Sequence, residues 1–214
     1  YTDEQIVVTS GMVLNPSFYD LPPMNRAHRR AALGLDPLRP TGVVMFGGQG
    51  SQQMLRIARE LDGVQLVLMC GRNELLAGQC RRLRRSAKHA VVGFTDEVAD
   101  VMRLADFFIG KPGPGALSEA VQLGLPVITI KNAWTMPQER YNAQWVREQG
   151  VGIVVPSVAR LAAAADEMIK DLPRWHAAAV RIDNRAVFEV PEVLSALLAR
   201  AATLAPRPSL RLVA

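Results

Sequence analysis

A proline- and glycine-rich stretch between residues 111 and 120 carries residue types that favour binding of an anion. It reads Lys-Pro-Gly-Pro-Gly-Ala-Leu-Ser-Glu-Ala, follows an apolar run at 107–109, and leads into a helical pattern that ends at Gly124. A turn of this kind directs backbone N–H groups and a helix N-terminus into one small space, which favours a phosphate. Glu119 is expected in the first turn of the helix, where its carboxylate can accept hydrogen bonds from ribose hydroxyls. The alternative is an ordinary tight turn followed by a helix-capping glutamate.

Two further loops follow apolar runs and are candidates for the same ligand. The stretch 47–51, Gly-Gly-Gln-Gly-Ser, looks like a phosphate loop but lacks the Lys-Ser/Thr ending of a P-loop. Gln53 stands where the dinucleotide-binding pattern has its last glycine, so neither triphosphate hydrolysis nor dinucleotide binding is expected. In the second loop Phe94 and Thr95 follow a strand pattern, and an aromatic ring beside free backbone groups can hold a flat base. The alternative is that Phe94 lies in the core and that Thr95 or Asp96 begins a helix.

A third group of polar residues, Gln138, Glu139 and Asn142, opens a predicted helix. Residues four apart share a helix face. The amide and carboxylate groups can therefore present several donors and acceptors together, as the recognition of sugar hydroxyls requires. The alternative is a solvated first helical turn.

The apolar pattern along the chain predicts the elements that hold these loops. Short, nearly continuous apolar runs alternate with helical patterns, which indicates an α/β fold with a Rossmann-like parallel sheet covered by helices on both faces. Right-handed crossovers place every strand-to-helix loop at the carboxyl edge of such a sheet, where ligands bind. The expected strands cover 43–46, 65–70, 90–92, 107–109, 127–130 and 153–155. The expected helices cover 52–61, 75–83, a stretch ending near 105, 117–123, 138–149, 158–170, 173–181 and 191–202.

The regular alternation begins only at residue 41, which predicts where the ligand-binding domain starts. The preceding segment is rich in proline and arginine, with a strand candidate at 5–9 and a helix candidate at 24–33. We expect it to be an interdomain crossover and linker, and because the chain begins with Tyr1 we expect an N-terminal domain upstream. Three parts are predicted. Residues 1–40 form the end of the N-terminal domain with the crossover and linker, residues 41–202 form the Rossmann-like ligand-binding domain, and residues 203–214 form a loose tail.

Composition excludes few classes of function. Hydrophobic residues make up 49% of the 214 residues, enough for a sizeable core, and the formal net charge is +5. This charge suits phosphate-bearing ligands, an anionic membrane surface or nucleic acid without choosing among them. Two cysteines, Cys70 and Cys80, are too few for a disulfide framework and indicate a reducing compartment. No signal peptide or bilayer-spanning apolar run is evident.

Four arginines lie within five positions at the end of a predicted helix, namely Arg81, Arg82, Arg84 and Arg85. This arginine cluster is interpreted as a solvated helix end, with contact to anionic lipid as the alternative.

Six motifs in one order give these loops a family resemblance. Together they resemble the C-terminal half of a GT-B glycosyltransferase of family 28, the group that contains MurG and the monogalactosyldiacylglycerol synthases. The resemblance is strong from Val43 to Val155, and residues 7–18 are similar to the interdomain crossover. The motifs are Gly47-Gly48-Gln49-Gly50, Gly93-Phe94-Thr95, Ala105-Asp106, Lys111-Pro112-Gly113-Pro114-Gly115 with Glu119-Ala120, Gly124-Leu125-Pro126, and Gln138-Glu139 with Asn142-Ala143.

The resemblance implies a binding site for a UDP-sugar donor. Phe94 and Thr95 would contact the uracil, and Glu119 would bind the ribose hydroxyls. No metal or other cofactor is implied, because loop N–H groups and the helix dipole would offset the charge of the leaving diphosphate. The residues expected around the diphosphate are Lys111, Gly113, Pro114, Gly115 and Ala116. Those expected to approach the diphosphate and sugar from the other side are Gly47, Gly48, Gln49 and Gly50, and those expected to read the sugar hydroxyls are Gln138, Glu139 and Asn142.

The resemblance also implies an activity, namely inverting transfer of a hexose from a UDP-sugar to a lipid acceptor, either diacylglycerol-like or a lipid-linked glycan. In the family that the chain resembles, the base that deprotonates the acceptor lies in the N-terminal half, so it is expected there. His28, His89 and His176 are placed as structural or surface residues and do not supply it. No catalytic residue is therefore assigned in this chain. The expected location is cytoplasmic, peripheral to the cytoplasmic membrane, with weak membrane binding by this chain and no nucleic-acid partner.

Two alternatives to this activity stay open. One is a nucleotide-sugar-binding subunit that is inactive without a membrane-anchored partner. The other is an enzyme similar to UDP-N-acetylglucosamine 2-epimerases, against which the turn at 112–115 argues, since those enzymes usually carry a serine-glycine-glycine turn there.

Overall fold

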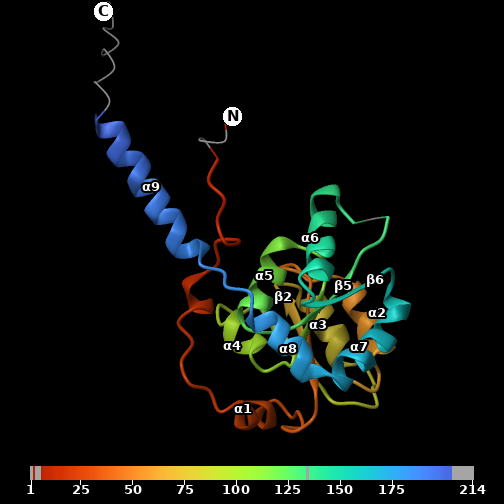
Figure 1. Cartoon of the computed structure of the whole chain (residues 1–214). Coiled ribbons are helices and arrows are strands. Elements are labelled where there is room, and N and C mark those ends of the chain that lie inside the picture. Colours follow the sequence, from red (N-terminus) through yellow and green to blue (C-terminus); the bar gives the residue numbers. More distant parts are fainter. Residues whose placement is uncertain (1, 3–5, 134, 204–214) are drawn as a thin grey trace, which may run out of the picture. The chain divides into compact units, whose positions relative to one another are not determined.

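The computed structural model describes residues 2, 6–133 and 135–203 (Figure 1). The chain divides into two compact units. The larger unit runs from Leu14 to Asp183 and contains a parallel sheet with its helices. The smaller unit is formed by residues 1–13 and 184–214. No helix of the described residues is long and apolar enough to cross a lipid bilayer.

The larger unit is built on one six-stranded parallel sheet with the strand order β3-β2-β1-β4-β5-β6. Its strands are β1 (Thr41–Met45), β2 (Gln65–Gly71), β3 (His89–Gly93), β4 (Phe107–Gly110), β5 (Val127–Ile130) and β6 (Gly152–Val155). Every residue of β1, β4 and β5 is buried. The strand order reverses between β1 and β4, and ligands of α/β folds bind beside such a switch point. The predicted Rossmann-like α/β fold is confirmed.

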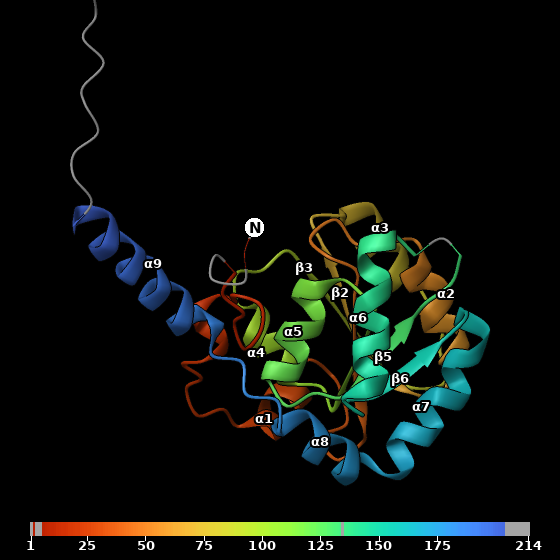
Figure 2. The same cartoon turned by 45° about the horizontal axis from the view of Figure 1, so that its top comes forward.

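Helices cover both faces of this sheet (Figures 1 and 2). The helical elements of the larger unit are η2 (Pro16–Phe18), α1 (Arg26–Ala32), α2 (Gln53–Glu60), α3 (Glu74–Arg81), α4 (Val98–Met102), α5 (Pro114–Gln122), α6 (Pro137–Glu148), η3 (Val158–Arg160), α7 (Leu161–Lys170) and α8 (Leu172–Val180). Val44 of β1 packs in a cluster with α2, α3 and α7, whereas Val43 and Met45 pack in a second cluster with α4, α5 and α6. Successive strand side chains point to opposite faces, which explains why the strands read as continuous apolar runs.

Some helix boundaries differ from those expected, for local physical reasons. Helix α5 begins at Pro114 rather than at 117, because proline suits the first helical turn, where its missing N–H needs no partner. Glu119 therefore lies in the second turn, and the expectation that it lies in the first turn or caps the helix is wrong. The helix expected at 158–170 opens with the 3-10 turn η3 before α7.

The segment that precedes the sheet belongs to the same compact unit, so the unit begins at Leu14 rather than at the expected residue 41. Leu14, Phe18 and Leu35 are buried in the cluster that covers the α5 face of the sheet. The unit also ends at Asp183, before the expected boundary at 202. Burial of these three apolar side chains explains the difference at the N-terminal end.

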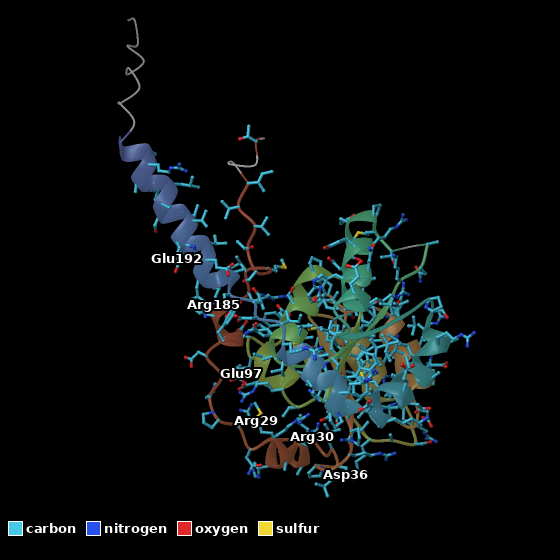
Figure 3. The ribbon with its side chains drawn as sticks, in the orientation of Figure 1. Arg29, Arg30, Asp36, Glu97, Arg185 and Glu192 are labelled. Carbon is cyan, nitrogen blue, oxygen red and sulfur yellow. The ribbon has the colours of Figure 1, made fainter. Side chains whose placement is uncertain are left out.

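A buried ion pair fastens α1 to the start of the sheet. Arg30, labelled on α1 in Figure 3, donates from Nη2 to Asp106 Oδ2 over 2.7 Å, and Arg26 donates from Nη2 to Asp106 Oδ1 over 2.6 Å. The backbone N–H of Thr41 donates to Asp106 Oδ2 over 2.7 Å. Burial lowers the pKa of Arg30, while the carboxylate of Asp106 acts in the opposite direction. Only 4% of the surface of Arg30 is exposed to solvent.

The smaller unit contains one long helix, α9 (Ala186–Thr203), which starts at Ala186 rather than at 191. Within this unit the N–H of Ser10 donates to Glu189 Oε2 over 2.7 Å, and the N–H of Arg185 donates to Ser10 Oγ over 2.7 Å. These bonds connect the N-terminal segment with the start of α9.

The strand expected at 5–9 is wrong for residues 6–9, which have no regular structure. Ile6, Val7 and Val8 have exposed side chains, and a lone extended segment gains no stability without a partner strand. Gln5 and the tail from 204 onward lie outside the described residues.

Candidate functional site

A first cavity, with a volume of about 280 Å³, lies at the carboxyl ends of β1, β2 and β3. Its walls come from the loops that follow these strands and from α5, which places it beside the switch point of the sheet. Six of the residues expected in the site line this cavity, and they come from three separate stretches of sequence. The lining residues are Met45, Gly47, Gly48, Met69, Gly71, Gly93, Phe94, Thr95, Val98, Ala116 and Glu119.

The loop after β1 is fastened to the end of β2 by backbone contacts. Gly71 has a φ of 59°, and a Cβ at this position would lie 2.2 Å from the carbonyl oxygen of Gly48. The next N–H, that of Arg72, donates to the same oxygen over 2.9 Å. The side-chain Nδ2 of Asn73 donates to the carbonyl oxygen of Gln49 over 3.3 Å. Only glycine allows this close approach, so Gly71 determines how the loop after β1 meets the end of β2 at the wall of the first cavity.

Glu119 supplies the carboxylate of the first cavity. Burial raises the pKa of Glu119 above its ordinary value. Its side chain forms no hydrogen bond or ion pair with any other described residue. An ionised carboxylate has about four acceptor positions, so Glu119 can accept hydrogen bonds from two neighbouring hydroxyls of a ligand. A partly buried carboxylate without a protein partner is costly for the fold, and a ligand that donates to it would offset that cost.

Phe94 and Thr95 stand on the loop between β3 and α4. Half of the Phe94 surface is exposed, at 50%, so the alternative that it lies in the core is wrong. The N-cap of α4 is Glu97, so the alternative of a helix start at Thr95 or Asp96 is also wrong. Thr95 Oγ1 instead accepts a hydrogen bond from the N–H of Glu97 over 3.0 Å, which shapes the turn. An exposed aromatic ring is thereby presented at the cavity.

A second cavity, with a volume of about 410 Å³, lies between the loops that follow β1, β4 and β5. It contains three of the expected site residues, namely Gly50, Lys111 and Glu139. The other lining residues are Phe46, Ser51, Gln53, Pro112, Ile130, Asn132, Thr135 and Met136.

Two contacts join the start of α6 to the loop at 111–113. Lys111 Nζ donates to Glu139 Oε1 over 2.7 Å, and Asn142 Nδ2 donates to the carbonyl oxygen of Pro112 over 2.8 Å. Glu139 is buried, so the alternative of a fully solvated first turn of α6 is wrong at this position. The ion pair between Lys111 and Glu139 leaves this part of the cavity wall close to neutral. It also connects α6 to the loop that leads into α5.

Six expected site residues line neither cavity. Gly113 is the N-cap of α5, and the two residues after it open that helix without reaching the first cavity. Gln138 is exposed, its Nε2 donates to Met136 Sδ over 3.4 Å, and it does not line the second cavity beside Glu139. The six residues are Gln49, Gly113, Pro114, Gly115, Gln138 and Asn142.

The sequence interpretation missed several residues of the first cavity. Met45 ends β1, Met69 lies two residues before the end of β2, Gly71 ends β2, and Val98 begins α4. The two methionines belong to apolar strand runs, which carry no local signal of a ligand. Gly71 did carry a signal, because a glycine at a strand end often marks a close backbone approach.

One member of the arginine cluster has a structural function. The guanidinium of Arg85 donates to the carbonyl oxygens of Ala58, Leu61 and Val64 over 2.7, 2.5 and 2.6 Å. These carbonyls lie at and just after the C-terminus of α2, where cations are stabilising. The interpretation of a solvated helix end is wrong for Arg85, whereas Arg84 is exposed.

The strand order and the cavity at its switch point define a Rossmann-like ligand-binding domain. The model of the glycosyltransferase family 28 C-terminal domain matches residues 43–182, and the chain belongs to this family. The family resemblance of the ordered loop motifs is thus confirmed.

Curated relatives agree with this assignment. The chain is 31% identical over 177 residues to the chloroplastic monogalactosyldiacylglycerol synthase of Spinacia oleracea. This match covers 77% of this chain and 32% of that protein. It is 28% identical over 180 residues to the processive diacylglycerol beta-glucosyltransferase of Bacillus subtilis (strain 168), covering 79% of this chain and 45% of that protein. The chain therefore spans less than half the length of either relative.

A solved structure supports the fold independently. The crystal structure of WaaG, a glycosyltransferase involved in lipopolysaccharide biosynthesis, superposes with a TM-score of 0.64 at 16% identity. The match covers 92% of this chain and 57% of the other.

Proposed function

We propose that this chain binds a UDP-sugar and is the donor-binding half of an inverting hexosyltransferase that acts on a lipid acceptor. The observation that carries the proposal is the carboxylate of Glu119, which is partly buried, has no partner among the described residues and forms part of the wall of the first cavity. The names of the two relatives, a monogalactosyldiacylglycerol synthase and a processive diacylglycerol beta-glucosyltransferase, support a lipid acceptor and a hexose.

In this proposal the two cavities take different parts of the donor. The base occupies the first cavity beside Phe94 and the backbone of Thr95, and the ribose hydroxyls donate to Glu119. The N-terminus of α5, from Gly113 to Ala116, supplies backbone N–H groups and a helix dipole to the diphosphate. The sugar extends toward the second cavity, where Glu139 forms part of the wall.

The transfer step requires a base outside this set of residues. The acceptor hydroxyl oxygen attacks C1 of the sugar, the bond between C1 and the diphosphate oxygen breaks, and the hydroxyl proton passes to a base. A base must lie within hydrogen-bond reach of that proton. Glu139 is engaged by Lys111, and it is the one carboxylate among the described residues that line the second cavity. The proposal therefore assigns the base and the acceptor site to an N-terminal domain, working at a membrane surface, and predicts that this chain alone binds donor without transferring sugar.

Calorimetry of the chain with UDP, CDP, ADP and GDP tests the donor site. We expect UDP to bind most tightly and to bind equally well in EDTA. Replacing Glu119→Gln should weaken UDP binding by about 1–3 kcal/mol, the scale for leaving buried polar groups unpaired, or about 5-fold to 150-fold in Kd. The matched control is Glu167→Gln, an exposed glutamate of α7, which should leave the Kd unchanged.

Two outcomes would contradict the proposal. Equal affinity for all four nucleotides would remove the uridine-specific site, and unchanged UDP affinity in Glu119→Gln would remove the assigned role of that carboxylate. Titration with UDP-galactose, UDP-glucose and UDP-N-acetylglucosamine then identifies the sugar.

A further inference from the structure

Arg72 contacts the ring of Phe94 at the first cavity, and the proposed donor site assigns no role to this arginine. Gly71 of β2 and Gly93 of β3 are partners in the strand register, so Arg72 and Phe94 each follow a paired glycine by one residue. The guanidinium carbon of Arg72 lies 3.7 Å from the centroid of the Phe94 ring. This distance is that of a close cation–π contact.

The backbone of Arg72 is well anchored. Its N–H donates to the carbonyl oxygen of Gly48 over 2.9 Å. The following residue, Asn73, caps α3 by accepting from the N–H of Leu76 over 2.9 Å. Arg72 therefore extends from a fixed strand end toward a ring that stands, half exposed, on a loop.

The guanidinium has no competing partner in the part of the chain that the structure describes. Arg72 is exposed, and its guanidinium forms no hydrogen bond or ion pair with any described residue. Its contact with Phe94 is thus the one interaction of this charged group within those residues.

We propose that Arg72 is a positioning residue for the nucleobase: it covers one face of the Phe94 ring and leaves the other face for the base. A half-exposed phenylalanine on a loop would otherwise exchange between rotamers, and binding would then have to order it. This inference rests on the proposed uridine-nucleotide site and adds to it a residue that acts through Phe94 rather than on the phosphates.

The test compares uridine, UMP and UDP as ligands of the chain, with uridine measured by its displacement of UDP. Arg72→Gln should weaken all three about two- to fivefold, the scale of an exposed cation–π contact. Arg72→Lys, which keeps a cation over the ring, should recover part of the loss. The control Arg84→Gln removes an exposed arginine outside the cavity and should change nothing.

A double-mutant cycle with Phe94→Leu decides whether Arg72 acts through the ring. We expect Arg72→Gln to have no further effect in the Phe94→Leu background. A loss confined to UDP and UMP and abolished by salt would show instead that Arg72 binds phosphate, and this would overturn the inference. Unchanged affinity in Arg72→Gln would overturn it too, while leaving the uridine site in place. Absence of UDP binding by the unaltered chain would overturn both proposals.

Discussion

Replacing Asp106→Asn removes the carboxylate that three donors share at the start of the sheet. The amide that replaces it has one acceptor oxygen, and its NH₂ group would face either Arg26, at the position of Oδ1, or Arg30 and the N–H of Thr41, at the position of Oδ2. Arg30 is the more sensitive partner, because its side chain is 5% exposed whereas that of Arg26 is 39% exposed. The variant thus leaves a buried positive charge without its counter-ion.

The expected loss follows from the partners that Arg30 retains. Breaking a buried ion pair by removing one partner destabilises a protein by about 3–5 kcal/mol. Arg30 Nε still donates to the carbonyl oxygen of Leu104 over 2.7 Å, and Nη1 still reaches the carbonyl oxygens of Pro37 and Arg39 over 3.1 and 3.3 Å. We therefore expect the lower end, about 3 kcal/mol, out of a total stability of about 5–15 kcal/mol for a domain.

Urea denaturation at neutral pH measures this loss as a change in the free energy of unfolding. The control is Asp171→Asn, which breaks a pair with Arg174 whose two side chains are 54% and 63% exposed. Exposed pairs contribute about 0.2–1 kcal/mol, so this control should lose less than about 1 kcal/mol. A loss of similar size in both variants would refute the argument that burial makes the Asp106 pair strong. UDP affinity should not change, because Asp106 immediately precedes β4, at the amino end of the strand.

Three further predictions concern single positions. Gly71→Ala should destabilise the fold and weaken UDP binding together, because its Cβ would meet the Gly48 carbonyl oxygen; a thermal melt and a UDP titration check both, and a neutral result contradicts the backbone contact. Arg85→Met should lower the melting temperature while Arg84→Met should not, since only Arg85 bonds to buried carbonyls. Glu119→Gln should raise stability at neutral pH, since burial raises the pKa of Glu119 and the native protein loses stability as pH rises through that raised value. The gain should disappear in acid below the unfolded pKa, and a gain that is independent of pH in denaturation curves would contradict this cause.

The sheet was predictable from sequence because its central strands β1, β4 and β5 are buried on both faces. The run Val127–Ile130 is apolar except for one threonine and was placed without error, and the other strands differ only at their ends. The attachment of residues 14–40 was not predictable, since it depends on Arg30 meeting Asp106, a residue 76 positions away. Periodic patterns describe a face of one element and carry no information on such distant polar partners.

The sequence predicted which loops form the candidate site, but it did not predict all the contacts of their side chains. Parallel topology alone brings the loops with Gly47, Phe94 and Glu119 to one edge, and these residues do line one cavity. The helical spacing of Gln138 and Asn142 placed them on one face of α6, but it could not show what each side chain contacts. Gln138 donates to the sulfur of Met136, and Asn142 donates to the carbonyl oxygen of Pro112.

The loop after β1 is a wall common to both cavities. Gly47 and Gly48 line the first cavity, and Gly50 and Ser51 line the second. Because one short peptide serves both, a substitution that shifts it alters both spaces at once. Sequence changes in the two cavities should therefore be epistatic, with combined effects that depart from the sum of the single ones. A change of sugar preference selected in the second cavity would then require compensating changes around the first, which restricts the order in which such substitutions can accumulate.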